Sequence, residues 1–354
     1  MELRAPPEGF ALGLGLTNEC DLACGHCYRD PTRLDRLSLD DVRRVLDAVP
    51  VRSVNLGTGE NGLHPQYAEI LDELHARNIK VSITSNGYSI AKLSDAQLAR
   101  FTEIEVSVDF PTEAEQDRWR APGNWALCMR ALERARALNV RAAVISVMMR
   151  TNHRVLAQVA HVAAAHGASF RVNVYQSVRG DTYALTYDEF WTAWRLLLAE
   201  TQLVVCTEPV VNAVLGRSGP ACRSGCGRTT VRVTPRGEVL PCVYWPERTL
   251  SVEELRGPIL DSEPFRHVRE VPEACRACPM VESCAGGCAS RRMLRSRPQE
   301  PDEYCPFARG ESITLLHTPA PTREVLKASS ACTTVVLGDA SRANPARRIL
   351  DERA

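Results

Sequence analysis

Short apolar segments alternate with helical patterns from residue 11 to about residue 200, and this alternation restricts the fold more than any other feature. Six of the apolar segments are predicted strands: Ala11–Thr17, Val51–Gly57, Ile79–Ser85, Ile104–Asp109, Ala142–Met149 and Phe170–Gln176. Repeated strand–helix units favour parallel strands joined by right-handed crossovers. Six units are too few for an eight-unit barrel. We therefore predict an α/β fold with an open, partial (β/α)6 barrel, whose ligands bind at the carboxyl ends of the strands.

The charge balance gives no indication of a nucleic acid or membrane partner. Lysine plus arginine and aspartate plus glutamate number 43 each, so the formal net charge is zero and no long-range field attracts polyanions. The first ten residues hold two prolines and no apolar core, unlike a signal peptide. No apolar run approaches the roughly 18 residues of a membrane helix. We expect a soluble, cytoplasmic protein.

The fourteen cysteines are distributed unevenly along the 354 residues. Three fall within residues 20–27 and eight within residues 222–305, while Cys128, Cys206 and Cys332 stand alone. In a reducing compartment, clustered cysteines are more often metal ligands than disulfides, because the thiolate is a soft donor. The distribution therefore predicts two metal-binding regions separated by a scaffold.

The first group has the spacing CxxxCxxC, formed by Cys20, Cys24 and Cys27, and directly follows the first predicted strand. Three thiolates can hold three irons of a 4Fe–4S cube and leave the fourth iron open to a cofactor. A structural zinc site normally takes four ligands in two separated pairs. Zinc is therefore the weaker alternative for this motif.

The second group contains enough cysteines for two complete sets of four ligands. Its members are Cys222, Cys226, Cys242, Cys275, Cys278, Cys284, Cys288 and Cys305. Two zinc ribbons are the alternative to two iron–sulfur clusters. Residues 201–310 are rich in Arg, Pro, Gly and Cys and carry little apolar core. We expect metal sites to supply much of the folding energy there.

With these motifs the chain resembles the radical S-adenosylmethionine (SAM) superfamily, in its SPASM subgroup. In that family the open iron binds SAM, and one electron from the cluster cleaves SAM to methionine and a 5′-deoxyadenosyl radical that abstracts hydrogen from the substrate. The resemblance implies catalytic roles for Cys20, Cys24 and Cys27. It also implies a radical SAM partial barrel over residues 9–200 and a SPASM domain over 201–310. Residues 311–354 form a tail, in which the apolar pattern predicts strands at Ser312–His317 and Thr333–Leu337.

The resemblance also implies SAM contacts at the ends of successive strands. Leu56–Glu60 is similar to the family's GGE motif, with Thr58 in place of a glycine, and Thr84–Gly87 is similar to its TNG-type segment. Asp117 and Arg120 resemble a D-x-x-R pair. The implied SAM contacts are Gly57, Gly59, Glu60, Ser85, Asn86, Ser107, Asp109, Arg120 and Asn152. Helix caps, turns and ordinary ion pairs are the alternative roles for the polar members.

For the second group, the resemblance implies two auxiliary 4Fe–4S clusters, which makes three clusters in all. The first would be bound by Cys222, Cys226, Cys242 and Cys288. The second would be bound by Cys275, Cys278, Cys284 and Cys305. Fully ligated clusters suit electron transfer or a structural role. Cys206 is either a buried packing residue or a hydrogen-atom donor, and Cys332 is unassigned.

Two substrate classes remain open. The favoured one is a ribosomally made peptide that becomes cross-linked or oxidised. The alternative is a small molecule (sugar, aminoglycoside or tetrapyrrole-like) handled by a dehydrogenase, epimerase or decarboxylase. A catalytically silent scaffold is disfavoured by the intact motifs. The candidate substrate contacts are Tyr175, Gln176, Arg179, Tyr244 and Trp245.

Two protein partners are expected for such an enzyme. The barrel begins by residue 11, so we expect no N-terminal leader-binding domain, and a peptide substrate would need a separate leader-peptide-binding protein. The electron that cleaves SAM would come from a donor such as flavodoxin or ferredoxin.

Overall fold

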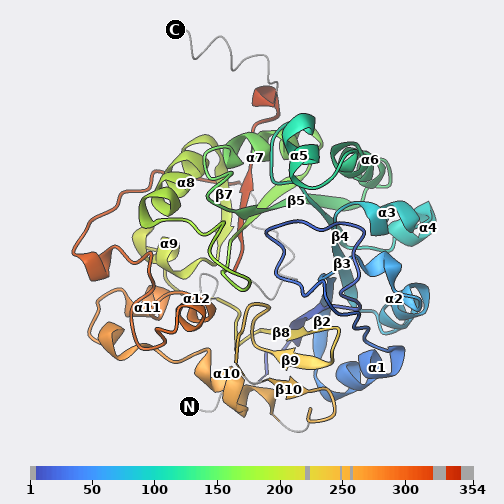
Figure 1. Cartoon of the computed structure of the whole chain (residues 1–354), viewed down its shortest axis with the longest axis horizontal. Coiled ribbons are helices and arrows are strands. Elements are labelled where there is room, and N and C mark those ends of the chain that lie inside the picture. The colour runs from blue at the N-terminus through green and yellow to red at the C-terminus, as the bar shows by residue number, and fades with distance from the viewer. Residues whose placement is uncertain (1–4, 220–223, 248, 256–257, 322–331, 344–354) are drawn as a thin grey trace.

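The computed structural model describes residues 5–219, 224–247, 249–255, 258–321 and 332–343. Its first half alternates strands and helices in the predicted order (Figure 1). The strands are β1 (Phe10–Leu14), β2 (Val51–Leu56), β3 (Lys80–Ser85), β4 (Glu103–Ser107), β5 (Arg141–Met148) and β6 (Ser169–Val174). The helices are α1 (Leu39–Ala48), α2 (Tyr67–Ala76), α3 (Tyr88–Lys92), α4 (Asp95–Leu98), α5 (Glu113–Trp119), α6 (Asn124–Ala137), α7 (Leu156–Ala165) and α8 (Tyr187–Glu200).

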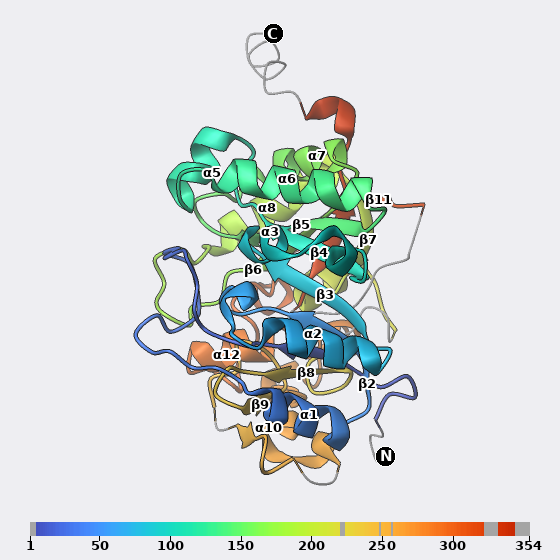
Figure 2. The ribbon, with the colours of Figure 1, turned by 90° about the vertical axis from the view of Figure 1, so that its right-hand side faces the viewer.

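The first six strands pair in parallel in the order β1-β2-β3-β4-β5-β6. Most of their residues are buried, and they form the main apolar core together with the inner faces of the helices. Figures 1 and 2 show the curved sheet with these helices along its outer side. The predicted α/β fold class, with a parallel partial barrel, is confirmed.

The second half of the chain extends this sheet at both edges. Its strands are β7 (Gln202–Cys206), β8 (Thr230–Val233), β9 (Glu238–Leu240), β10 (Leu250–Ser251), β11 (Thr318–Pro319) and β12 (Thr334–Leu337). Its helices are α9 (Pro209–Val214), α10 (Glu263–His267), α11 (Val281–Cys284) and α12 (Ala289–Leu294). β8 pairs in parallel with β1, so the cysteine-rich region is joined to the barrel by backbone hydrogen bonds. The residue boundaries of the three predicted regions stay predictions.

The C-terminal segment returns to the barrel. β12 lies between β6 and β7 and is antiparallel to both, which agrees with the strand predicted at Thr333–Leu337. The strand predicted at Ser312–His317 is wrong. That stretch is irregular, and only the two residues of β11 after it pair with β7.

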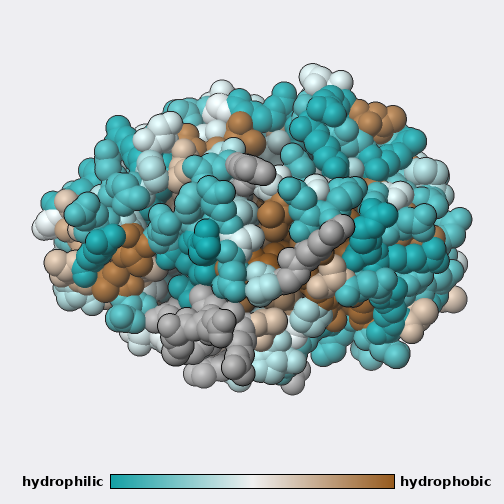
Figure 3. Space-filling view, turned by 90° about the horizontal axis from the view of Figure 1, so that it is seen from below, coloured by the Kyte–Doolittle hydropathy of each residue, from teal (hydrophilic) through white to brown (hydrophobic). Residues whose placement is uncertain are grey.

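The outer surface seen in Figure 3 is mostly hydrophilic, with apolar residues in small separate groups. Within the described part of the chain, every helix is too short or too polar to cross a membrane.

Candidate active site

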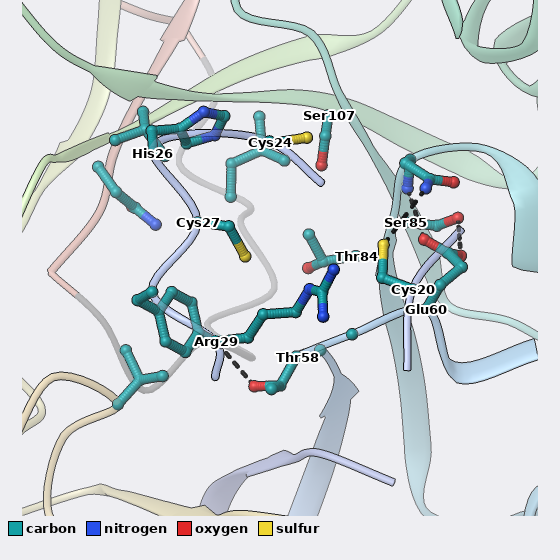
Figure 4. Close-up of a pocket in the computed structure, with 18 of the residues that line it drawn as sticks. Cys20, Cys24, His26, Cys27, Arg29, Thr58, Glu60, Thr84, Ser85 and Ser107 are labelled. Carbon is teal, nitrogen blue, oxygen red and sulfur yellow. Dashed lines mark hydrogen bonds between the residues drawn. The ribbon is translucent and has the colours of Figure 1, made fainter. Parts of the chain in front are cut away.

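The loop after β1 carries the CxxxCxxC motif and borders an open cavity of about 1230 Å³. Figure 4 shows the sulfur atoms of Cys20, Cys24 and Cys27 on different sides of this cavity. Arg29 stabilises the loop by donating a hydrogen bond of 2.6 Å to the carbonyl oxygen of Leu22. Because β1 to β6 are parallel, their carboxyl ends face the same cavity, as the sequence predicted.

The loop after β2 packs directly against the cysteine loop. The backbone N–H of Glu60 donates to the carbonyl oxygen of Glu19 at 2.6 Å. The adjacent Gly59 has a φ of +61°, and a Cβ there would collide with the carbonyl oxygens of Thr17 and Glu19. Only glycine fits this approach, so Gly59 sets the spacing between the two loops.

Replacing Gly59 with alanine is expected to slow reductive SAM cleavage roughly 100-fold, because a displacement of about 1 Å at a reacting centre has that cost. The measurement is the rate of 5′-deoxyadenosine formation with dithionite and excess SAM. Gly167→Ala is the matched control, since Gly167 also has a positive φ, of +72°, but has open space around its Cα. Equal rates in the two variants would show that the close approach at Gly59 is unimportant.

Glu60 connects the loops after β2 and β3. Its carboxylate is buried and accepts hydrogen bonds from the Ser85 hydroxyl at 2.5 Å and from the backbone N–H groups of Asn86 and Ser89, both at 2.9 Å. Burial raises the pKa of Glu60, and these hydrogen bonds oppose that rise. With both oxygens engaged, Glu60 positions the segment that presents Asn86 to the cavity.

A buried ion pair lies next to Cys24. Asp109 is fully buried and accepts hydrogen bonds from Arg120 Nε at 2.9 Å and Nη2 at 2.7 Å. Burial by itself raises the pKa of Asp109, but the charge of Arg120, with hydrogen bonds from Arg120 and from the Val147 N–H, lowers the pKa overall. Arg120 Nη1 is 4.0 Å from the Cys24 sulfur. The pair therefore keeps a positive charge beside one of the three thiols.

His26 is a cavity residue that sequence reasoning missed. Its ring stacks on Trp119 with centroids 5.4 Å apart. Burial lowers the pKa of His26 to about 4, against the opposing charge of Asp109. The imidazole is therefore neutral near pH 7. The only signal in the sequence is its position directly before Cys27.

Arg232 was also missed, because it enters the cavity from β8 in the second half of the chain. Its Nη2 donates to the carbonyl oxygen of Gly57 at 2.7 Å and to the hydroxyl of Thr58. The Tyr28 hydroxyl lies 2.6 Å from the same Thr58 oxygen, and the Tyr28 ring meets Tyr244 edge to face. Thr58 has a φ of 79°, a conformation that favours glycine. These side-chain contacts give a reason for threonine at this position of the motif.

Seven of the nine predicted SAM contacts line the cavity: Gly57, Gly59, Glu60, Ser85, Asn86, Ser107 and Arg120. Asp109 and Asn152 do not. Asp109 holds Arg120, whereas Asn152 accepts from the Met149 N–H at 2.8 Å and donates to the Val147 carbonyl at 2.9 Å. These contacts shape the turn after β5. A contact between SAM and any of these nine residues stays a prediction.

Among the candidate substrate contacts, Tyr175, Gln176 and Tyr244 line the cavity, and Arg179 and Trp245 do not.

Asp117 and Cys206 make hydrogen bonds within the protein and do not line the cavity. Asp117 accepts hydrogen bonds from the backbone N–H groups of Gly123 and Trp125 at 2.7 and 2.8 Å, so it organises the turn into α6. Cys206 is buried on β7, accepts a hydrogen bond from the Thr334 hydroxyl at 3.2 Å and does not line the cavity.

The cysteines of the second half gather in two places. Cys226 and Cys242 interact through their thiols. The four cysteines of the second predicted set also lie within electrostatic range of one another: burial raises the pKa of Cys284 to about 11, and the charges of Cys305, Cys275 and Cys278 add to the rise. Cys222, predicted for the first set, lies outside the described residues.

A buried ionic network connects these two places. Arg291 Nη2 donates to Glu208 and to Asp302, both at 2.7 Å. Asp302 also accepts from the backbone N–H of Cys288 at 2.7 Å. Gly287 has a φ of +91°, and a Cβ there would collide with Asp302. The network therefore fixes the backbone at Cys288 and ties α12 to the segment before α9.

The CxxxCxxC loop and the two cysteine groups of the second half all suit iron–sulfur clusters, because cysteine sulfur is the usual ligand of such clusters. Two buried nitrogen atoms, His26 Nδ1 and Arg291 Nη1, have no hydrogen-bond partner among the described residues. Arg291 Nη1 can donate to a negatively charged cluster or its ligands, and His26 Nδ1 can do so in the tautomer that carries its proton on that atom. Within the described ranges, no three His, Cys, Asp or Glu side chains are arranged to hold a single metal ion.

An α/β partial barrel with three cysteines and a strand-end cavity defines a class of enzyme. The family model for the radical SAM superfamily matches residues 14–161. The mycofactocin maturase MftC of Mycobacterium ulcerans is 30% identical over 324 residues, which cover 82% of this chain and 86% of that protein. The PqqA peptide cyclase of Gluconobacter oxydans is 25% identical over 335 residues, which cover 86% and 92% of the two chains.

The fold agrees with solved structures. Streptococcus suis SuiB bound to S-adenosylmethionine superposes with a TM-score of 0.62 at 17% identity, over 83% of this chain and 76% of that chain. The chain belongs to the radical SAM superfamily and carries a SPASM-type C-terminal region. It is an enzyme that uses SAM and a 4Fe–4S cluster.

Proposed function

We propose that this enzyme modifies a ribosomally made peptide, by cross-linking or oxidation, at the cavity beside Cys20, Cys24 and Cys27. The observation that carries the proposal is the lining of that cavity, in which Tyr175, Gln176 and Tyr244 border the same space as the three cysteines. The cavity is open to solvent, so a side chain of a longer peptide can enter it while the rest of the peptide stays outside. The named functions of the relatives, a maturase and a peptide cyclase, support the same substrate class.

In this proposal the three thiolates hold the SAM-binding cluster. When bound, the cluster supplies the electron that cleaves SAM and produces the 5′-deoxyadenosyl radical. The chain contributes orientation: Gly59 spaces the loops, Glu60 positions Asn86, and Arg120 brings a positive charge close to Cys24. Arg232 and Tyr244 cover the cavity from the second half of the chain, which limits the access of water.

We also propose two auxiliary 4Fe–4S clusters. The buried thiols near Cys242 and near Cys284 support this assignment, together with the unpartnered N–H of Arg291 between the two places. Their proposed work is to carry electrons to or from the substrate radical, since a cross-link or an oxidation removes electrons from the peptide.

The proposed substrate class is tested with synthetic peptides encoded by short reading frames beside the gene. Each peptide is incubated anaerobically with reconstituted enzyme, SAM and dithionite. The expected result is a mass change in one peptide, together with 5′-deoxyadenosine above the peptide-free rate. If every peptide stays unchanged while a sugar or another small metabolite is consumed in step with SAM, the peptide proposal is wrong.

The proposed system includes a cytoplasmic electron donor such as flavodoxin or ferredoxin and a separate leader-peptide-binding protein. Both are tested in the same assay. Flavodoxin with its reductase should replace dithionite, and a leader-binding protein should lower the peptide concentration needed for half-maximal turnover.

A further inference from the structure

Cys332 belongs to none of the predicted cysteine sets, yet the sheet holds its backbone in a defined place. It precedes β12, which pairs with both β6 and β7. The next residue, Thr333, exchanges hydrogen bonds with Thr207 at 2.8 and 3.1 Å, and its hydroxyl donates to Asn173 at 2.6 Å. Cys332 is therefore positioned by strand pairing.

The thiol of Cys332 lies among the cysteines of the first auxiliary set. It interacts with the thiols of Cys226 and Cys288, and Cys226 in turn interacts with Cys242. These four residues come from distant parts of the sequence. Three of them, Cys226, Cys288 and Cys332, line an open cavity of about 970 Å³. Three thiols that border one cavity, with Cys242 packed against Cys226, match the four-ligand set that one 4Fe–4S cluster needs.

Hydroxyl groups and one buried cation surround these thiols. The Ser224 hydroxyl lies 3.4 Å from the Cys332 sulfur, and the Ser290 hydroxyl donates to Cys242. The buried guanidinium of Arg291 acts on both Cys288 and Cys332, and its Nη1 has no partner in the described part of the chain. Hydrogen bonds and a fixed positive charge stabilise a negatively charged cluster and tune its potential.

We propose that Cys332 binds an iron of the first auxiliary cluster, together with Cys226, Cys242 and Cys288. Binding converts the Cys332 thiol to a thiolate, and its proton goes to solvent. The inference rests on the proposed auxiliary clusters but not on the peptide substrate. It competes with the assignment of Cys222, because five thiols would then be available for four positions.

A second consequence concerns communication with the active site. Thr333, next to the proposed ligand, bonds to Asn173, and Asn173 lines the SAM cavity. The C-terminal strand therefore connects the first auxiliary cluster to the substrate side of the barrel through two consecutive residues. Residues 332–337 then supply a cluster ligand in addition to pairing with β6 and β7.

The test removes the SAM-binding cluster first, so that only auxiliary iron is counted. In a parent variant with Cys20, Cys24 and Cys27 all changed to alanine, about eight irons per chain are expected after reconstitution, four for each cube. Adding Cys332→Ser should reduce this to about four, or retain iron with a changed EPR spectrum and a shifted midpoint potential. Adding Cys222→Ser should leave all three readouts at the parent values.

Cys128→Ser in the same parent is the control for the loss of a buried thiol, because Cys128 lies on α6 and outside both cysteine sets. A parent without iron would disprove the auxiliary clusters themselves. Parent-like iron, EPR spectrum and potential in Cys332→Ser would disprove the ligand assignment alone.

If Cys332→Ser does not fold, Cys332→Asp replaces it, since a carboxylate can also bind iron. A changed EPR spectrum and a shifted potential in the aspartate variant would support ligation, and parent values would overturn it.

Discussion

Replacing Cys24 with alanine is expected to abolish reductive SAM cleavage while the protein still folds. The substitution removes one of the three thiolates, and the cofactor carries the hard chemistry. Enzymes accelerate reactions by ~10⁶-fold or more, and loss of the cluster should remove most of that acceleration. The rate of 5′-deoxyadenosine formation should therefore fall at least ~10⁴-fold. Cys24 lies in a loop and its side chain is only partly buried, so little core packing is lost.

The matched control is Cys206→Ala, which removes a buried thiol that does not line the cavity. It should leave SAM cleavage unchanged. Circular dichroism and thermal unfolding would establish that the Cys24 variant is folded. Normal SAM cleavage by a folded Cys24→Ala protein would show that the SAM-binding cluster has been placed wrongly.

Replacing Arg171 with methionine is expected to destabilise the barrel by about 3–5 kcal/mol, because it leaves buried carboxylates without their cation. Arg171 on β6 lies 2.8 Å from Glu103 and 3.2 Å from Glu105, both on β4, and all three side chains are buried. The measurement is the midpoint of anaerobic urea unfolding. Arg141→Met is the control: Arg141 is exposed at the start of β5, and its loss should change stability by no more than about 0.5 kcal/mol.

The destabilisation should also depend on pH. Burial already raises the pKa of Glu103, and the charge of Arg171 opposes that rise. Without Arg171 the folded-state pKa rises further above the unfolded value. The carboxylate then costs stability at pH values above its unfolded pKa, and protonation removes this cost as the pH falls. The gap between the Arg171→Met and wild-type midpoints should therefore shrink from pH 8 to pH 5. A gap that is the same at both pH values would contradict this explanation.

Local sequence patterns determined much of the fold and part of the site. The strand–helix alternation was sufficient to predict β1 to β6, because each unit is specified by its own apolar spacing and its own turns. The CxxxCxxC motif and the strand-end segments could be placed at one cavity because parallel strands bring their carboxyl ends to the same side. Gly59 and Glu60 were implied by the resemblance of Leu56–Glu60 to the family's GGE motif, and their contacts are with neighbouring loops.

The tertiary structure decided the contacts between segments that are distant in sequence. Arg232 reaches Gly57 only because β8 pairs with β1, and Cys332 reaches Cys226 and Cys288 only because β12 inserts between β6 and β7. The role of Asn152 was open for the same kind of reason: a strand-end amide can face a ligand or the backbone of its own turn. No local pattern specifies how distant strands pair, because that pairing is selected by the burial and hydrogen bonding of the whole sheet.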